Sequence, residues 1–557
     1  MGGGQRGLAV MYTFDVETSY NGIEAWVWSW ALCDEELKTT HGNGLNVLSG
    51  LLSLPDGCDV FVHNLPFDGE FLHYELQAAG FKLKYDLDKR QRYHGVYEML
   101  EDLQGMVNMT IHYKGRRITL RDSNRIFRCR LARLPKVCGF ADEEVKGVMD
   151  YDAIRQRDHT PTADELAYQL SDVRVLMRAM LWLRGHAPKG YTVGSIAMNE
   201  FKAVLQKTPF GVMSDGDRNA IRSLYNGGVV HIGSSVEREV FRGVGRTYDE
   251  NSMYPHKQHS CPLPVAVSRR GLGNAPLLRR AGEDYAVHVQ ARGLKLREHG
   301  FPLLITPFTG RARAAIPLLD KWLFIDEFDA ILREYDAEHV EVVEHVVFDT
   351  EIIGREFVDK WYTIKATESN RRDFAKMVLN NVTGKLAEHN VHEQMRRSVT
   401  ADGEYVNYRY DEVSEPNRWT FMPATAKITS LSRLDLRQAV IESGRENLLY
   451  TDTDSVHTTG TLPPHRLDDN ALGAWKCENE FDRALYIKPK SYWEQFGGRT
   501  TAMKHAGINP NATLSVGGRD SGIPIAPDNM VAGAKYWTNQ SKRVKGGVAI
   551  VRIEKQM

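Results

Sequence analysis

Two strand-like segments, one near each end of the chain, each carry a pair of carboxylates separated by a single residue. The first is FDVET, with Asp15 and Glu17, and the second is YTDTDS, with Asp452 and Asp454. In an extended strand the side chains of residues i and i+2 point to the same face. Two ionised carboxylates this close repel each other, which is costly in an apolar segment unless a cation lies between them. The sequence therefore predicts two separate cation sites.

Composition describes an ordinary globular protein. The chain has 557 residues, of which 42% are hydrophobic and 26% are charged, and this length allows three or four domain-sized units. No apolar run approaches the ~20 residues of a membrane span, and the first residues carry no signal-peptide pattern. The six cysteines lie far apart without a CxxC pair, which argues against a zinc site or a disulfide framework and fits a reducing cytosol. We expect no membrane association.

Charge is balanced overall but clustered locally. There are 71 basic and 72 acidic side chains, so the net charge is −1. Between Lys114 and Lys136 nine basic residues stand against one acid, Asp122, and a second basic cluster occupies residues 542–545. Either cluster alone fits a solvated face as well as it fits a contact with phosphates.

The first 190 residues alternate between strand-like and helix-like segments. Residues 8–18 and 59–68 have the β-branched and aromatic content of strands. Residues 162–185 have apolar residues at helical spacing, an acidic first turn and a glycine at the end. We place a domain boundary near residue 190. Further along we expect a charged helical segment, another helix and then a strand, over residues 352–387, 424–443 and 447–457.

Two further segments carry groups suited to a nucleotide site. Asp249 ends the strand-like VGRTYD and is followed by Tyr254 and a turn proline. A metal-holding carboxylate would therefore lie beside an aromatic ring that can stack on the sugar of a nucleotide or sterically limit it. In FAKMVLNNVTGK, Lys376 and Asn380 are four residues apart and share a helix face, with Thr383 one turn further on. A lysine and an amide there suit a triphosphate. Alone, the segments also fit a capped turn and an amphipathic helix.

In this order, DENSMYP, KMVLNNVTGK and YTDTDS resemble the three palm and fingers motifs of family B DNA polymerases, and KPKSYW resembles their lysine-x-tyrosine element that holds the primer end. The resemblance implies that Asp249 and Asp454 hold two Mg²⁺ or Mn²⁺ ions ~3.5–4 Å apart, which activate the primer 3′-hydroxyl and neutralise phosphate charge. Asp452 is implied to support them. The implied nucleotide contacts are Tyr254, Lys365, Lys376, Asn380 and Thr383, and the implied primer contacts are Lys490 and Tyr492.

A second set of segments, FDVET, HNLPFD and YQLSD, supplies four carboxylates, Asp15, Glu17, Asp68 and Asp172, and a tyrosine, Tyr168, four residues before the last of them. The three segments resemble the exonuclease motifs of the DEDD superfamily with tyrosine in the third. The resemblance implies an RNase H-like 3′→5′ exonuclease with two divalent ions, in which the tyrosine hydroxyl orients the attacking water. It also implies supporting contacts to phosphates and to a frayed primer end, and so favours a DNA-channel role for the basic cluster. These contacts are Asn64, Phe67, Ser123 and Lys146.

The element SLYNGGVV, with Tyr225, Gly227 and Gly228, resembles the linker motif of phi29-like bacteriophage polymerases. The two glycines would let the backbone approach a DNA strand closely, although a turn fits them too. Residues 263–351 and 388–419 resemble the two insertions of protein-primed family B enzymes. The first insertion is implied to contact a terminal protein whose hydroxyl primes synthesis. The second is implied to encircle DNA and to support processivity and strand displacement.

The resemblance covers essentially the whole chain and implies a multidomain fold of α/β and α+β type. An RNase H-like exonuclease domain precedes a right-hand polymerase of palm, fingers and thumb with two palm insertions. The implied domains are the exonuclease (1–190), the palm (191–262 and 420–510), the first insertion (263–351), the fingers (352–387), the second insertion (388–419) and the thumb (511–557). The implied partners are primer-template DNA, deoxynucleoside triphosphates and a terminal protein, and we expect a monomer in the cytoplasm of a bacterial host cell.

Two positions depart from the family pattern. Thr383 stands where the family commonly has tyrosine, and Asn381 stands where serine is usual. An aromatic ring lost from such a place removes stacking worth up to a few kcal/mol, so we expect altered nucleotide selectivity. The metal-ligand positions all match the pattern.

Two alternatives stay open at this point. One is a family B polymerase of plasmid or repair role that extends an ordinary nucleic-acid primer. The other is a non-catalytic DNA-binding replication scaffold, which predicts gaps in the carboxylate sets, and no such gap is present. A reverse transcriptase is disfavoured because YTDTD is not the adjacent Asp-Asp form.

Overall fold

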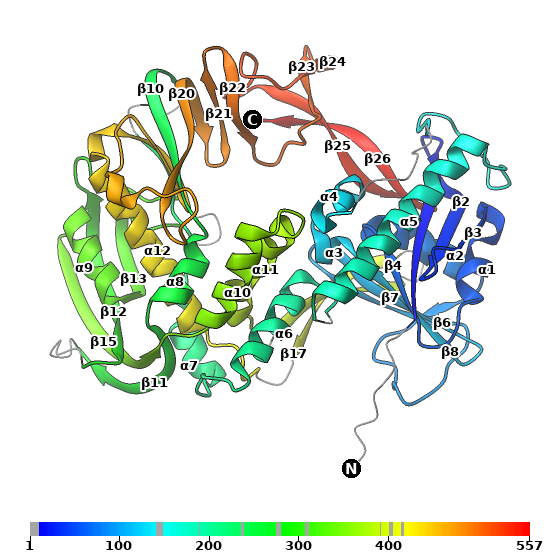
Figure 1. Cartoon of the computed structure of the whole chain (residues 1–557), viewed down its shortest axis with the longest axis horizontal. Coiled ribbons are helices and arrows are strands. Elements are labelled where there is room, and N and C mark those ends of the chain that lie inside the picture. The colour runs from blue at the N-terminus through cyan, green and yellow to red at the C-terminus, as the bar shows by residue number, and fades with distance from the viewer. Residues whose placement is uncertain are drawn as a thin grey trace.

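In the described part of the chain, the computed structural model consists of four β-sheets, with ten, seven, five and four strands, and the helices packed between them. The sheets follow one another around an arc, and the C-terminal strands bridge back across its top to the N-terminal part (Figure 1). The structure describes residues 10–140, 149–188, 190–233, 236, 239–273, 280–306, 311–389, 391–399, 405–413 and 417–557.

The N-terminal part is built on a mixed sheet of strand order β17-β16-β6-β7-β8-β4-β1-β2-β3, with β5 beside β6. Helix α2 (Leu65–Ala78) buries Phe71, Leu72 and Leu76 against one face, and α5 (Ala163–His186) covers β1 and β2 on the other. The strands are β1 (Met11–Tyr20), β2 (Ala25–Asp34), β3 (Thr39–Asn43), β4 (Asp59–Val62), β5 (Lys82–Leu83), β6 (Val96–Asp102), β7 (Gly105–Tyr113), β8 (Arg116–Asp122), β16 (Val391–Val399) and β17 (Tyr405–Val413). The smaller helices are α1 (Val47–Leu52), α3 (Asn124–Phe127) and α4 (Leu134–Cys138).

Helix α5 begins where the sequence predicts it. The side chain of Thr162 accepts a hydrogen bond from the N–H of Glu165, whose side chain bonds back to the Thr162 N–H. This reciprocal cap satisfies two of the otherwise unpaired N–H groups at the helix start. It fixes the origin of the helix that carries Tyr168 and Asp172.

The second sheet is antiparallel, with strand order β22-β21-β20-β10-β19-β18-β9. Helix α12 (Met422–Glu442) packs Leu436, Ala439 and Val440 into the same core as Val456 of β19. The strands are β9 (Val230–Ile232), β10 (Val240–Glu250), β18 (Leu448–Asp452), β19 (Ser455–Thr458), β20 (Trp475–Lys488), β21 (Ser491–Phe496) and β22 (Arg499–His505). Helix α8 (Met253–Ser260) follows β10 directly.

The third sheet has strand order β11-β15-β12-β13, with β14 beside β12. Its elements are β11 (Leu263–Leu272), β12 (Glu283–Leu296), β13 (Ala315–Phe324), α9 (Ile325–Glu334), β14 (Tyr335–Asp336) and β15 (His339–Glu351). The segment 352–387, predicted to be helical, forms two packed helices, α10 (Arg355–Thr367) and α11 (Arg372–Leu386). Helices α6 (Val193–Leu205) and α7 (Asp215–Ala220) lie in the connection from the N-terminal part.

The C-terminal sheet has strand order β24-β23-β25-β26. Its strands are β23 (Thr513–Val516), β24 (Arg519–Pro524), β25 (Lys535–Val544) and β26 (Gly547–Gln556). Its far end touches α2, because Gly547 lies so close to Phe71 that a Cβ atom there would be 2.3 Å from the ring. The hairpin β16–β17 also reaches the N-terminal part, since Met395 pairs with Glu101 of β6. Two segments distant in sequence therefore dock on the first sheet.

Candidate active sites

The second acidic pair lies on a hairpin turn, and the prediction of one extended strand was wrong. Strand β18 ends at Asp452, β19 begins at Ser455, and these two residues pair across the turn. Thr453 has a φ of +67°, in the left-handed region, and the N–H of Asp454 donates to the carbonyl of Asp452 (2.8 Å). The two carboxylates therefore do not share a strand face, because the chain reverses between them.

The turn brings Asp454 to the end of β10, where Asp249 lies. Asp249 pairs with Ser455 in the sheet, and the N–H of Glu250 donates to the carbonyl of Asp454 (2.9 Å). Burial and the charge of Asp454 raise the pKa of Asp249 to about 7. Burial, and then the charge of Asp452, raise the pKa of Asp454. Clustered carboxylates that resist ionisation are the electrostatic condition that a divalent cation relieves.

The Tyr-x-Gly-Gly segment supports this turn from beneath. A Cβ atom on Gly228 would lie 2.6 Å from Cγ2 of Thr453, whereas one on Gly227 would meet nothing within 4 Å. The guanidinium of Arg433, 1% exposed, donates to the carbonyls of Asn226 and Gly227 (both 2.8 Å). The close approach that Gly228 permits is thus an approach to the protein's own β18–β19 turn. Tyr225 is 42% exposed.

A cavity of about 600 Å³ opens beside the two carboxylates, between the second sheet and helices α10 and α11. Most of the residues predicted to bind metal or nucleotide line it together. These are Asp249, Tyr254, Lys365, Lys376, Asn380 and Asp454.

The cavity walls also carry cationic groups that the sequence analysis missed. Arg372 lies one helical turn before Lys376 on α11, Lys476 lies on β20 and Lys504 lies on β22. The amine of Lys365 donates to the hydroxyl of Ser252 (2.8 Å), and burial followed by the charges of neighbouring cations lowers its pKa to about 8. Arg372 had a signal in its i, i+4 spacing to Lys376. Lys476 and Lys504 had none, because their strands reach the cavity only through sheet pairing.

Thr383 does not line the cavity. Its side chain is 3% exposed and its hydroxyl has no hydrogen-bond partner, while its carbonyl accepts a hydrogen bond from Thr425 of α12 (2.7 Å). Asn381, the other position that departs from the family pattern, donates its side-chain amide to the carbonyl of Met377 (2.7 Å). The structure therefore places Thr383 in the packing between α11 and α12, away from the predicted nucleotide contact.

The predicted primer contacts lie beside Asp452. The amine of Lys490 donates to Asp452 (2.7 Å), and the N–H of Lys490 donates to the Tyr450 hydroxyl (2.9 Å). The ring of Tyr492 is 3% exposed and packs against Tyr450 and His457. Lys490 is thus the accessible member of the pair, and Tyr492 belongs to an aromatic cluster beneath the hairpin.

The first acidic pair does lie on one strand, β1, and the other two predicted exonuclease carboxylates join it from α2 and α5. Burial, and then the charges of Asp172 and Asp68, raise the pKa of Glu17 to about 8. Burial, and then the charge of Asp15, raise the pKa of Asp68 well above its ordinary value. Three segments therefore bring four carboxylates into one cluster. Carboxylate oxygens are the ligands that Mg²⁺ and Mn²⁺ prefer, so both acidic clusters fit such ions.

Helix α2 presents Asn64, Phe67 and Asp68 from its first turn. Asn64 has a φ of +76°, and the carboxylate of Asp122 accepts hydrogen bonds from the N–H groups of Asn64 (3.0 Å) and Leu65 (3.3 Å). This contact holds a strained turn in place. Asn64 is exposed, and Phe67 is half-buried against Phe71.

Ser123 is not presented to a DNA strand. Its side chain is fully buried, with its hydroxyl 3.0 Å from Nδ1 of His63 and 3.1 Å from the carbonyl of Val62.

A tyrosine that the sequence analysis missed approaches the acidic cluster of β1, α2 and α5 from a loop. The hydroxyl of Tyr151 donates to that of Tyr168 (2.9 Å). Lys146, predicted to be a phosphate contact, lies outside the described residues.

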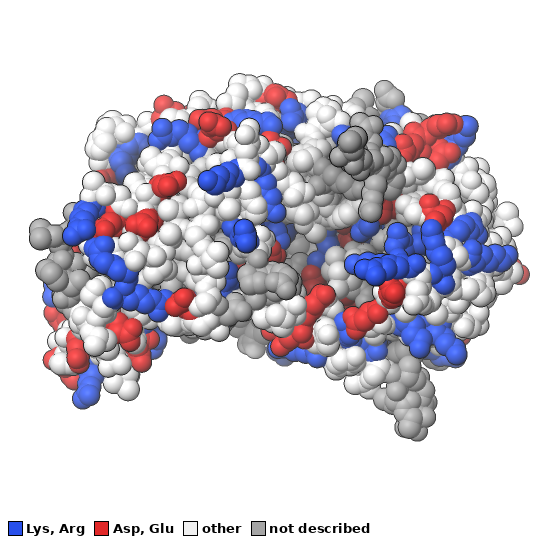
Figure 2. Space-filling model, turned by 90° about the horizontal axis from the view of Figure 1, so that it is seen from below, with Lys and Arg blue, Asp and Glu red and all other residues white. Residues whose placement is uncertain are grey.

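The basic segment 114–136 is largely engaged within the protein. Arg121 pairs with Asp59 (2.7 Å), Arg125 pairs with Asp102 (2.6 Å), and Arg116 donates to carbonyls of the 52–54 loop. The DNA-channel role that the sequence favoured for the basic cluster is therefore not supported for these arginines. Seen from below, the surface interleaves basic and acidic side chains (Figure 2).

Among the residues that the structure describes, one group of three side chains has its possible ligand atoms within 4.8 Å of one another, and it belongs to neither acidic cluster. Glu250, His256 and Asp435 bring their ligand atoms together, but the amine of Lys257 donates to both Glu250 (2.9 Å) and Asp435. A lysine thus already supplies the balancing cation there.

The chain is similar to known DNA polymerases. The family described as DNA polymerase type B, organellar and viral, matches residues 164–268. The DNA polymerase of Bacillus phage phi29 is 27% identical over 511 residues, covering 86% of each chain, and that of Streptococcus phage Cp-1 is 24% identical over 532 residues, covering 88% of this chain and 86% of the other. The chain is a homologue of the phi29-like DNA polymerases. The predicted relationship is confirmed.

The fold of a phi29-like polymerase extends over the whole chain. A solved structure of phi29 DNA polymerase with primer-template DNA and incoming nucleotide matches it with a TM-score of 0.86 and 22% identity, covering 99% of this chain and 100% of the other. The structure of the same polymerase with single-stranded DNA matches with a TM-score of 0.85 and 22% identity, over the same shares. This likeness confirms the predicted multidomain fold, an exonuclease fold followed by a polymerase fold. Within the described part of the chain, no helix is long and apolar enough to span a membrane.

Proposed function

We propose that this phi29-like chain is a template-directed DNA polymerase with a proofreading 3′→5′ exonuclease. One observation carries the polymerase assignment. Asp249 and Asp454 meet beside a cavity whose walls carry Lys365, Arg372 and Lys376. Carboxylates and cations around one cavity are what a metal-bound triphosphate requires.

The residues of this cavity have different roles in the proposed reaction. Divalent ions bound at the carboxylates would lower the pKa of the primer 3′-hydroxyl and neutralise charge on the phosphates. Asp249, at the end of β10, and Asp454, in the adjacent β18–β19 turn, hold those ions, and Lys365 and Lys376 bind triphosphate oxygens. The half-buried ring of Tyr254 limits the space for the sugar. Lys490, beside Asp452, is placed to contact the primer strand.

The exonuclease proposal rests on the second acidic cluster. Asp15, Glu17, Asp68 and Asp172 bind divalent ions, and Tyr168 orients the attacking water. Asn64 and Phe67, at the start of α2, receive the frayed 3′ end. The separation of this cluster from the nucleotide cavity requires the primer end to move between them.

We further propose protein-primed, strand-displacing replication. The support is the presence of the third sheet and of the hairpin β16–β17, at the positions of the insertions expected for protein-primed enzymes. The partners would be primer-template DNA, deoxynucleoside triphosphates and a terminal protein that offers its hydroxyl. Because the compared relatives include bacteriophage proteins, we infer that the chain acts in the cytoplasm of an infected bacterial cell. We further propose that it acts there as a monomer.

The polymerase proposal is tested by extension of a labelled primer on a circular single-stranded template with Mg²⁺ and four deoxynucleoside triphosphates. We expect template-dependent extension, and we expect it to continue through a downstream duplex. Failure to extend with either Mg²⁺ or Mn²⁺ would refute the polymerase assignment. Extension that stops at the duplex would refute only strand displacement.

Two further assays test the finer proposals. Shortening of a 5′-labelled single strand from its 3′ end, without nucleotides, reports the exonuclease. Protein priming requires a labelled nucleotide to become covalently attached to a partner protein when no nucleic-acid primer is present. Extension without such attachment, with candidate partner proteins from the same genome supplied, would favour the nucleic-acid-primed alternative.

A further inference from the structure

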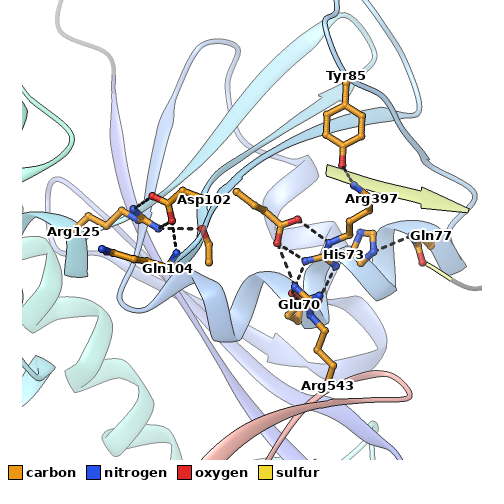
Figure 3. Close-up of polar contacts among 11 residues, drawn as sticks. Glu70, His73, Gln77, Tyr85, Asp102, Gln104, Arg125, Arg397 and Arg543 are labelled. Atoms are coloured by element: carbon orange, nitrogen blue, oxygen red, sulfur yellow. Dashed lines mark hydrogen bonds and ion pairs between the residues drawn. The ribbon is translucent and has the colours of Figure 1, made fainter. Parts of the chain in front are cut away.

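Two arginines from the polymerase part of the chain converge on the exonuclease fold. Arg397 of β16 donates to Glu70 of α2 and to Glu101 of β6 (both 2.8 Å). Arg543 of β25 lies 2.7 Å from the same Glu70 oxygen that Arg397 binds and 3.4 Å from Glu101. Figure 3 shows both guanidinium groups directed at Glu70 from different elements. The cluster joins residues 296 to 473 positions apart.

The cluster balances its charge only when all parts are docked. The side chains of Arg397, Glu70 and Glu101 are 3%, 9% and 3% exposed, so the two carboxylates have little water around them. Buried carboxylates without a partner are strongly destabilised. The exonuclease fold alone leaves Glu70 and Glu101 as a like-charged pair. The hairpin β16–β17 and strand β25 supply the two compensating cations.

Glu70 lies on the helix that carries exonuclease residues. It follows Asp68 by two positions and Phe67 by three, within the first two turns of α2. A residue that fixes Glu70 therefore fixes the axial position and rotation of that helix start. The N-terminal side of the same turn is held by Asp122.

A second connection leads from the cluster to Asp122. Glu101 is followed by Asp102, whose carboxylate accepts two hydrogen bonds from Arg125 (2.6 and 2.9 Å), as Figure 3 also shows. The Nε of Arg125 lies 3.7 Å from Asp122. The arginine cluster thus contacts the α2 start both through Glu70 and along the end of β6.

We propose that Arg397 and Arg543 are positioning residues for the exonuclease reaction. By pulling Glu70 and Glu101 into one charge cluster, the docked hairpin and the C-terminal strand set the register of α2 and so place Phe67 and Asp68. This inference rests on the proposed exonuclease function. Its consequence is specific: loss of Arg397, in the second insertion, and of Arg543, in the thumb, impairs degradation while leaving nucleotide addition intact.

The test uses the full chain with Arg543→Ala, Arg397→Lys and the double variant. Arg543 is half-exposed, with 49% of its side chain accessible, so its loss is compatible with folding. Arg397→Lys keeps a charge but loses the forked hydrogen bonds. The matched controls are Arg396→Ala, which removes a pair with Asp86 from the neighbouring residue of β16, and Arg552→Ala, which removes a pair with Asp520 within the thumb.

Each variant is compared in single-strand degradation, in the Mn²⁺ concentration that half-saturates it, in primer extension and in thermal unfolding. For the double variant we expect degradation to fall about tenfold or more and the half-saturating Mn²⁺ concentration to rise, as for lost outer contacts of a metal site. Extension in the first minute and both controls should stay within about twofold of the unmodified chain.

Three outcomes would overturn the inference. The first is a double variant that degrades DNA with unchanged rate and Mn²⁺ dependence. The second is an equal loss in the Arg396→Ala control. The third is a fall in melting temperature that accounts for parallel losses of degradation and extension. Absence of degradation by the unmodified chain, with extension intact, would instead remove the proposed exonuclease, and this inference with it.

Discussion

Gly228 and Thr453 lie so close that a Cβ atom on the glycine would be 2.6 Å from Cγ2 and 2.9 Å from Cα of the threonine. The N–H of Thr453 donates to the carbonyl of Val229 (2.9 Å), so the linker segment and the catalytic turn are packed against each other through their backbones. Asp454 is the next residue of that turn. A side chain at position 228 would have to displace Thr453, and with it the turn that carries Asp454.

Gly228→Ala is expected to reduce primer extension by about 10- to 100-fold, because a displacement of the order of 1 Å at a catalytic group costs that much. Single-strand degradation should be unchanged. Gly227→Ala is the matched control, since a Cβ atom there meets nothing within 4 Å, and it should extend primers normally. Equal effects of the two substitutions, measured side by side, would contradict the packing argument.

Asp249→Asn is expected to stabilise the metal-free chain while it abolishes extension. Burial and Asp454 raise the folded-state pKa of Asp249 to about 7, above the ordinary value of about 3.9. Its contribution to stability is thus fully present below about pH 4 and is lost as the pH rises to about 7. At pH 8 in EDTA the asparagine variant should be more stable by an amount on the order of 2 kcal/mol.

Thermal unfolding between pH 4 and pH 8, with and without Mg²⁺, measures this effect. The difference between the two proteins should shrink toward pH 4, and Mg²⁺ should stabilise the unmodified chain more than the variant. A variant that is less stable at pH 8 in EDTA would show that Asp249 makes favourable structural contacts instead of bearing a repulsion.

Lys376→Ala is expected to raise the KM for deoxynucleoside triphosphates by about 10- to 100-fold, because a charge-assisted hydrogen bond to phosphate is worth about 1.5–3 kcal/mol. Lys385→Ala is a control on the same helix, since Lys385 lies outside the cavity lining and its amine bonds Glu388. Steady-state extension kinetics measure the KM of both variants for deoxynucleoside triphosphates. Unchanged KM values for Lys376→Ala would remove this lysine from the nucleotide site.

Thr383→Val is expected to leave stability and nucleotide KM within about twofold, because it removes a buried hydroxyl that has no hydrogen-bond partner. This substitution separates the two roles considered for the residue. A KM increase of about tenfold or more would restore Thr383 as a nucleotide contact, as its place in the helix motif first indicated.

The sequence was most informative where function depends on neighbours within one element. Asp15 and Glu17 on β1, Lys376 and Asn380 on α11, and the capped start of α5 all follow from spacing alone. These patterns are governed by strand and helix periodicity. The fold was predicted from the resemblance to a polymerase family that the order of such motifs carries.

The sequence was least informative where a local choice depends on distant partners. Thr453 adopts a left-handed backbone conformation, although the glycine or asparagine that usually indicates one is absent from this position. Its contact with Gly228 depends on the three-dimensional fold and has no signal in the sequence. The sequence favoured a DNA-channel role for Arg121 and Arg125, because their ion-pair partners, Asp59 and Asp102, are distant in the sequence. The cations at Lys476 and Lys504 likewise depend on how β20 and β22 pair.

We propose that two remote sets of carboxylates form two independent metal-dependent sites. Asp454→Ala and the double change Asp15→Ala, Glu17→Ala separate these sites when each variant is assayed for extension and for single-strand degradation in the same preparation. We expect Asp454→Ala to lose extension and keep degradation, and the double variant to do the reverse. Loss of both activities in either folded variant would contradict the independence of the two sites.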